Sequence, residues 1–127
     1  MISVLIKSAK KFGLEENLVR LWTEKALKKY HLDNCELSLI FIEPKEILNL
    51  NKKYRNLNEA TSILTFFQGQ AYPESNRGTN PEKIFLLGDV IICPLVAAEK
   101  NLTIEFLINH GIRNLLSEIP TAKSLRT

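Results

Sequence analysis

The sequence predicts a single α+β domain over residues 1–127, with a small sheet of about four strands packed by four to five helices. Two observations predict it: short β-branched runs alternate with longer segments of helical apolar spacing, and the whole chain has the length of one domain. Hydrophobic residues make up 45% and charged residues 24%, a balance typical of globular proteins that excludes a disordered chain. We therefore expect one core shared by strands and helices.

Two strands and two helices are expected in the first half of the chain. Residues 2–6 suit a buried strand, and residues 35–42 are apolar on both faces, as in a central strand covered on both sides. Residues 14–30 predict a helix with one apolar stripe. The stripe consists of Leu14, Leu18, Leu21, Trp22 and Ala26. Pro44 suits the first turn of a second helix that ends near residues 55–58. Its core-facing residues are Ile47, Leu48, Leu50 and Tyr54.

The second half of the chain predicts two further strands separated by one long loop. Residues 63–67 form the first of these strands. From residue 68 to 82, glycine, proline, serine and asparagine break every period, which is typical of a surface loop. Residues 85–93 predict a strand that Gly88 and Asp89 interrupt. Because a charge inside an apolar strand needs a partner, we expect Asp89 to pair with a basic group or to lie at a strand end.

A short helix from Pro94 to about residue 101 and a longer last helix complete the expected elements. Thr103 can cap the longer helix. Its apolar stripe consists of Ile104, Leu107, Ile108, Ile112, Leu115 and Leu116. At about 100° per residue, His110 projects from nearly the opposite side and is not a core histidine. Asn114 follows it one turn later on the same face.

Charge and cysteine usage bound the class of protein. The 17 basic and 14 acidic residues give a formal net charge of +3, which permits contact with a polyanion such as RNA. Cys35 and Cys93 lie in apolar segments, where free cysteine acts as a small hydrophobe and a reducing compartment fits best. No apolar run approaches the roughly 20 residues of a membrane helix, and the start of the chain lacks a signal-peptide cleavage site. We therefore expect a cytoplasmic protein without a membrane partner.

Three motifs occur in a recognisable order between residues 35 and 118. The first, LNKKYRN followed by TSILTF, contains Arg55. The second, LGDVII, contains Asp89, and the third, NHGIRNLL, contains His110. Each motif is unspecific by itself, but in this order and spacing the chain resembles the YbeY family, the metal-dependent endoribonucleases of ribosomal RNA maturation.

The resemblance implies a small mixed sheet flanked by helices, with the histidine motif on a late central helix. It implies that Arg55 binds phosphate and acts in catalysis, since a guanidinium forks onto phosphate oxygens. Lys52 and Lys53 would extend an RNA-binding rim beside it. His110 is implied as metal ligand and catalytic residue, with zinc as the cofactor and metal-assisted phosphodiester hydrolysis as the reaction. The implied partner is RNA, above all ribosomal RNA, with the ribosome or its proteins as further partners and no DNA.

The departures from the family pattern fall on the metal site. Of the three histidines with which the family binds its metal, only the first is present, as His110. Asn114 and Pro120 occupy the other two positions, and neither is a good zinc ligand. The other departures are Ser62, Ser117 and Ile119. The zinc site that the resemblance implies is therefore incomplete.

Three functions stay open at this point. The first is a YbeY-like ribonuclease whose activity the missing ligands would impair, and the second is a non-catalytic RNA- or ribosome-binding module on the same fold. The third is a small protein-interaction domain. A purely structural role is also open for the two main site residues. His110 could be an exposed histidine hydrogen-bonded to a neighbouring loop, and Arg55 could be a surface arginine at a helix end. The final segment SEIPTAKSLRT lacks the expected motif, which is compatible with a C-terminus truncated or replaced relative to the family.

Overall fold

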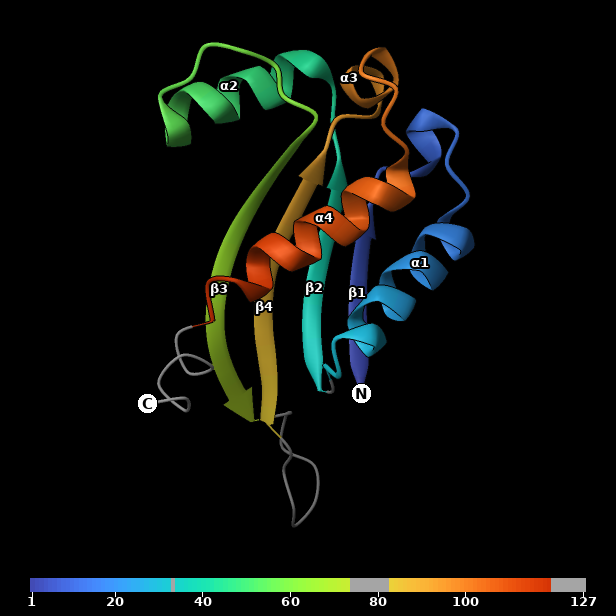
Figure 1. The fold of residues 1–127 in the computed structure, drawn as a ribbon, viewed down its shortest axis with the longest axis vertical. Helices are drawn as coiled ribbons and strands as arrows, with labels where there is room; N and C mark the ends of the chain where they lie inside the picture. Colours follow the sequence, from blue (N-terminus) through green and yellow to red (C-terminus); the bar gives the residue numbers. More distant parts are fainter. Residues whose placement is uncertain (33, 74–82, 120–127) are drawn as a thin grey trace.

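The computed structural model describes residues 1–32, 34–73 and 83–119 (Figure 1). The strands are β1 (Ile2–Lys7), β2 (Cys35–Phe41), β3 (Ile63–Pro73) and β4 (Lys83–Ile92). The helices are α1 (Glu16–Lys29), α2 (Pro44–Arg55), α3 (Pro94–Glu99) and α4 (Ile104–Leu116), with a 3-10 turn at Lys10–Phe12. None of the helices in the described part is long and apolar enough to cross a bilayer.

The four strands form one mixed sheet in the order β1-β2-β4-β3. Strands β1, β2 and β4 are parallel, whereas β3 runs antiparallel to β4 and forms an edge of the sheet. Helices α1 and α4 contact each other and lie across the same face of the sheet (Figure 1). The predicted fold class, a small mixed sheet packed by four to five helices, is confirmed.

The main core lies between the sheet and the pair α1 and α4. Alternate residues of β2 point into it and are fully buried, namely Cys35, Leu37, Leu39 and Phe41. The residues between them are only half-buried on the opposite face. A smaller second cluster around Ile47, Leu64 and Ile91 packs α2 against one end of that opposite face. The strand expected to be covered on both sides is therefore covered fully on one side and partly on the other.

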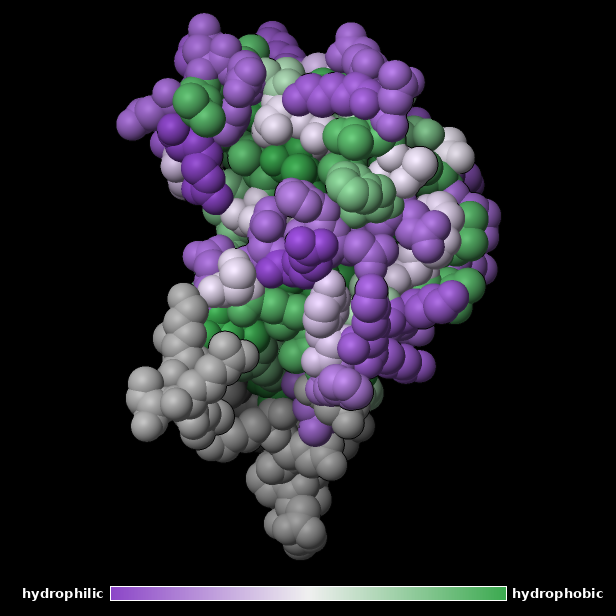
Figure 2. Space-filling view, viewed as in Figure 1, coloured by the Kyte–Doolittle hydropathy of each residue, from purple (hydrophilic) through white to green (hydrophobic). Residues whose placement is uncertain are grey.

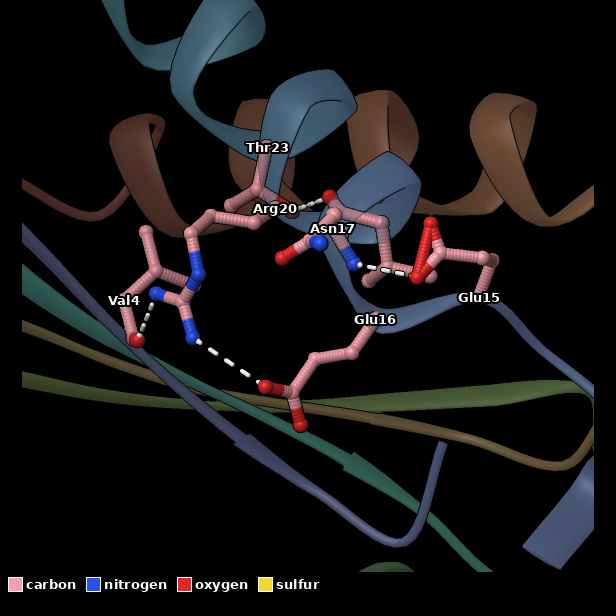
Figure 3. Close-up of polar contacts among 7 residues, drawn as sticks. Val4, Glu15, Glu16, Asn17, Arg20 and Thr23 are labelled. Carbon is pink, nitrogen blue, oxygen red and sulfur yellow. Dashed lines mark hydrogen bonds and ion pairs between the residues drawn. The ribbon is translucent and has the colours of Figure 1, made fainter. Parts of the chain in front are cut away.

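Helix α1 is attached to β1 by an arginine that sequence reasoning did not single out. Arg20 Nη1 donates to the backbone carbonyl of Val4 at 2.6 Å, and its Nη2 lies 3.7 Å from Glu16 Oε2 (Figure 3). At the start of the helix, Glu15 accepts a hydrogen bond from the backbone N–H of Asn17 at 3.1 Å. These contacts fix one end and one face of the helix against the edge strand.

The buried face of α1 differs from the predicted stripe. Its buried residues are Val19, Thr23, Ala26 and Leu27. Leu18 and Leu21, expected in the core, are 42% and 57% exposed. A polar residue can face the core here because the Thr23 hydroxyl donates to the Val19 carbonyl at 2.8 Å, which satisfies it inside its own helix.

Helix α4 packs as the sequence predicts. Thr103 caps it by accepting a hydrogen bond from Phe106 N at 3.1 Å. The buried residues include four of the predicted stripe, Leu107, Ile108, Ile112 and Leu115. A Cβ added to Gly111 would lie 2.8 Å from Val90 Cγ1 and 3.1 Å from Ile63 Cδ1. Glycine at this position therefore lets the helix approach β3 and β4 closely.

The prediction of a loop over residues 68–82 is wrong for residues 68–73. Strand β3 continues through Pro73 and β4 begins at Lys83, so residues 68–73 belong to a strand. Residues 74–82 lie outside the described part. The glycine that suggested a loop, Gly69, has φ +63 and lies in a register shift between the paired strands. The alternation of apolar and polar residues is interrupted here because the strand continues through a β-bulge.

Strand β4 carries a second irregularity at Gly88. This residue has φ +146, and a Cβ placed on it would overlap the backbone carbonyl oxygen of Phe66. Pairing with β2 shifts register at the same level, between Glu36 and Leu37. Only glycine adopts this backbone without strain, so it fixes the approach of β3 to β4 just before Asp89.

Candidate functional site

A hollow of about 310 Å³ opens on the face of the sheet opposite α4. Its lining residues are Leu50 and Tyr54 of α2, Phe66 of β3, and Asp89 and Ile91 of β4. Asp89 and Ile91 point away from α4 because they alternate with Val90, which faces Gly111 of that helix. The incomplete cover of this face leaves the hollow open.

Arg55, the last residue of α2, lies at the side of this hollow. Its Nη2 donates to the backbone carbonyl of Thr65 at 2.7 Å, and its Nη1 donates to the carbonyl of Tyr54 at 3.3 Å. The guanidinium carbon lies 4.9 Å from the centroid of the Phe66 ring. These contacts orient an exposed guanidinium while most of its donors remain for a ligand.

Two aromatic rings form a corner next to the arginine. Tyr54 and Phe66 have ring centroids 5.3 Å apart at an interplanar angle of 74°. Lys53 Nζ lies 5.2 Å from the centroid of the Tyr54 ring. Tyr54, expected to face the core, is 52% exposed and therefore offers its ring to solvent. Lys52 and Lys53 are exposed beside Arg55, where basic residues also complement the helix dipole.

Asp89 lies inside β4 rather than at its end, contrary to one of the expected arrangements. The other expected arrangement, an ion pair with a basic group, is not found among the described residues. Instead, Asp89 Oδ2 accepts a hydrogen bond of 3.4 Å from Gln68 Nε2. The residue is half-buried and lines both this hollow and a smaller one that includes Ser38 and Gly88. Sequence reasoning missed it as a site residue, although its interruption of an apolar run was a signal.

His110 lies on the outer surface of α4 and is exposed, as predicted. Its ring stacks on Phe106 with centroids 5.9 Å apart and an interplanar angle of 15°, so an aromatic ring is its neighbour instead of the loop that was the alternative. In Figure 2 the outer surface of α4 forms a strongly hydrophilic patch between apolar areas. His110 is not among the residues that line the hollow beside Arg55, and over the described ranges no hydrogen bond or ring contact joins the two side chains.

The described residues do not fit a zinc ion. No group of three histidine, cysteine, aspartate or glutamate side chains gathers anywhere in residues 1–32, 34–73 and 83–119. Asn114 is exposed one turn after His110, and Glu118 follows the end of α4 at Leu116. Pro120, which occupies the third family position, lies outside the described residues. Since catalytic zinc sites use three protein ligands, His110 does not form one with its described neighbours.

A second concave surface of about 650 Å³ lies between α1 and α4. Its lining residues are Trp22, Lys25, Ala26, Lys28, Lys29, Glu105 and Asn109. Trp22 is half-buried at its base, as the core assignment of this residue predicts in part. The lysines give this groove a basic side, on the sheet face away from Arg55.

Comparison with known proteins identifies relatives over most of the chain. The family model for YbeY, described as Endoribonuclease YbeY, matches residues 6–116. The Endoribonuclease YbeY of Dehalococcoides mccartyi is 32% identical over 129 residues, which cover 91% of this chain and 75% of that protein. The protein of the same name from Treponema denticola is 32% identical over 122 residues, covering 90% and 76%. The solution structure of TM1509 from Thermotoga maritima superposes with a TM-score of 0.52 at 26% identity, covering 91% of this chain and 71% of that one.

Proposed function

This chain belongs to the YbeY family, and on that premise we propose that it is an endoribonuclease that acts in the maturation of ribosomal RNA. The family consists of metal-dependent nucleases. The observation that supports the proposal in this chain is the oriented, exposed guanidinium of Arg55 beside an aromatic hollow. A guanidinium so placed can stabilise the charge that builds on the phosphate while RNA is cleaved.

In this proposal Arg55 binds the phosphate at the cleaved bond. Its bond to the Thr65 carbonyl and its position over the Phe66 ring orient the guanidinium, so the remaining N–H groups can fork onto two phosphate oxygens. Lys52 and Lys53 add a positive rim that attracts the neighbouring phosphates. The partner is RNA, which we expect to be ribosomal RNA in the cytoplasm, with the ribosome or its proteins as further partners.

His110, implied by the resemblance as metal ligand and catalytic residue, is our candidate for contact with a metal; because it lies on the outer surface of α4, away from the hollow beside Arg55, we assign it no proton transfer at the phosphate that Arg55 binds. Zinc is the ion that the family resemblance implies. Since no group of three possible ligands occurs in the described residues, at His110 or elsewhere, we assign no step of the reaction to a metal. Metal analysis of the purified chain, compared with a His110→Ala variant, tests this: metal retained by the parent and lost from H110A would support His110 as a ligand.

Arginine substitutions test the proposed phosphate contact. We expect Arg55→Gln to weaken binding of a ribosomal RNA fragment by about tenfold or more, because a charged hydrogen-bonding partner is lost. Arg55→Lys should recover only part of the affinity, since an ammonium keeps the charge but not the fork. Arg113→Gln, at an exposed position of α4, serves as the matched control. Equal binding and cleavage by R55Q and R113Q would refute the assignment.

A second candidate, a non-catalytic RNA-binding module, is favoured by one observation, the missing three-ligand group in the described part. The same experiment separates the two functions. Cleavage by the parent chain that is lost in R55Q supports the endoribonuclease. RNA binding that depends on Arg55 without any cleavage, over a range of added divalent metals, supports the module.

A further inference from the structure

The residues beside Arg55 form a continuous surface that leads from a cation to a carboxylate. The Arg55 guanidinium lies over the Phe66 ring, and Phe66 pairs in register with Asp89 on the neighbouring antiparallel strand. Directly paired residues point to the same face of a sheet with their Cβ atoms about 4.5 to 5.5 Å apart. The guanidinium, the ring and the carboxylate therefore follow one another across this face.

The hollow next to this surface has the chemistry of a pocket for a flat, partly apolar ligand. Its walls are the rings of Tyr54 and Phe66, with the aliphatic side chains of Leu50 and Ile91. The single charged group among its lining residues is Asp89. Its volume of about 310 Å³ lies near the lower end of the range for small-ligand sites, roughly 300 to 1,000 Å³. An aromatic ring that is half exposed, as Tyr54 is, offers a face on which a base can stack.

Asp89 has acceptor capacity that the described structure does not use. It is half-buried, and the bond from Gln68 Nε2 to Oδ2 is long at 3.4 Å. A carboxylate has two oxygens and can accept two parallel hydrogen bonds from adjacent donors.

We propose that this hollow binds one unpaired nucleobase of the RNA, with Asp89 selecting guanine. Guanine carries two adjacent donors on its Watson–Crick edge, N1–H and the 2-amino group, which match the two oxygens of one carboxylate. Adenine and cytosine place an unprotonated ring nitrogen there, and uracil offers one N–H between two carbonyls. These edges are available only in single-stranded RNA. The inference rests on the proposed function and adds a base preference at the nucleotide whose phosphate Arg55 contacts.

Binding of short single-stranded RNAs by the full chain tests the preference. The probes are fluorescent oligouridylates with one central guanine, inosine, adenine or cytosine, and the readout is anisotropy. We expect the guanine probe to bind about tenfold more tightly than the inosine probe, which lacks only the 2-amino group, and more tightly still than the adenine probe. Equal affinity for the guanine, inosine and adenine probes would overturn the inference.

Two variants and a control assign the preference to the hollow. Asp89→Asn keeps the shape but turns one of the two acceptors into an N–H donor, so the preference for guanine over inosine should fall to near onefold, and adenine, whose N1 and 6-amino group match an amide, should bind at least as tightly as it does to the parent. Tyr54→Leu, at an exposed position, should weaken the guanine, adenine and cytosine probes alike by about fivefold or more through lost stacking. Glu59→Gln removes an exposed carboxylate near the end of α2 and should leave every affinity as in the parent. A guanine preference that survives in D89N, with Y54L behaving as the parent does, would place base reading elsewhere.

The outcomes distinguish this inference from the function on which it rests. Binding that depends on Arg55 but is equal for all four probes removes the guanine assignment and leaves the proposed ribonuclease intact. No binding of any probe, together with no effect of Arg55→Gln on a ribosomal RNA fragment, removes both.

Discussion

Replacing Gly88 with alanine tests the strand geometry that places Asp89 in the hollow. The backbone has φ +146, where an L-residue is strained by roughly 1 to 3 kcal/mol. The added Cβ would also lie 3.1 Å from both the Phe66 carbonyl carbon and the Phe67 Cα, and would overlap the Phe66 carbonyl oxygen. Backbone atoms of a paired strand cannot turn aside, so overpacking adds about 1 to 3 kcal/mol. We expect Gly88→Ala to lower the free energy of unfolding by about 2 to 6 kcal/mol.

Gly13→Ala is the matched control for this substitution. Gly13 has φ +72, and a Cβ placed on it meets nothing within 4 Å, so alanine there adds backbone strain without a clash. Its expected cost is about 1 to 2 kcal/mol. Both variants carry the backbone strain, so the clash alone should make G88A about 1 to 3 kcal/mol less stable than G13A, which urea unfolding followed by circular dichroism should show as a midpoint roughly 0.5 M or more lower. If G88A were as stable as G13A, the close approach of β3 to β4 at this point would be wrong.

Three further predictions concern other parts of the fold. Gly111→Ala should destabilise by about 1 kcal/mol in urea unfolding, since contact with Val90 costs more than the roughly 1 kcal/mol gained in helix propensity; a more stable variant would contradict the tight packing of α4. Thr103→Ala should cost about 1 kcal/mol by loss of the cap on α4, whereas Thr103→Ser should be near neutral, and equal losses would argue against capping. Burial raises the pKa of the Cys93 thiol, so the native state holds this proton more tightly than the unfolded chain. Stability should therefore be full below the ordinary thiol value of about 8.5 and decline as pH rises above it, and Cys93→Ala should lose that slope in unfolding measured against pH.

The order of elements and the pattern of α4 could be read from the sequence because they depend on local periodicity. Thr103, the buried stripe and the exposed position of His110 follow from spacing along one helix. The buried face of α1 could not be read in the same way. Its segment has apolar residues on more than one side, so periodicity does not decide which side is buried. Packing against α4 decides it, and the buried side can include Thr23 because its hydroxyl donates to the Val19 carbonyl within the helix.

The candidate site was predictable only in part. Arg55 and its neighbouring lysines were found through a motif, whereas the hollow depends on which residues of β3 and β4 face each other. That register depends on the irregular backbone at Gly69 and Gly88. The sequence pattern around Gly69 predicted a loop instead of a bulged strand. The separation of His110 from the hollow was equally hidden, because it follows from the sheet lying between α4 and the Arg55 side.

The strand order has a consequence for how the protein folds during synthesis. Strand β3 precedes β4 along the chain, yet β4 is its sole neighbour in the described sheet and lies between it and β2. A nascent chain that has emerged only as far as β3 therefore carries a strand with no partner, next to a β1-β2 pair whose inner edge is open. Such edges invite pairing with other chains. Emergence of β4 closes both edges in one step, so the slowest and most aggregation-sensitive stage of folding should be the insertion of this single strand.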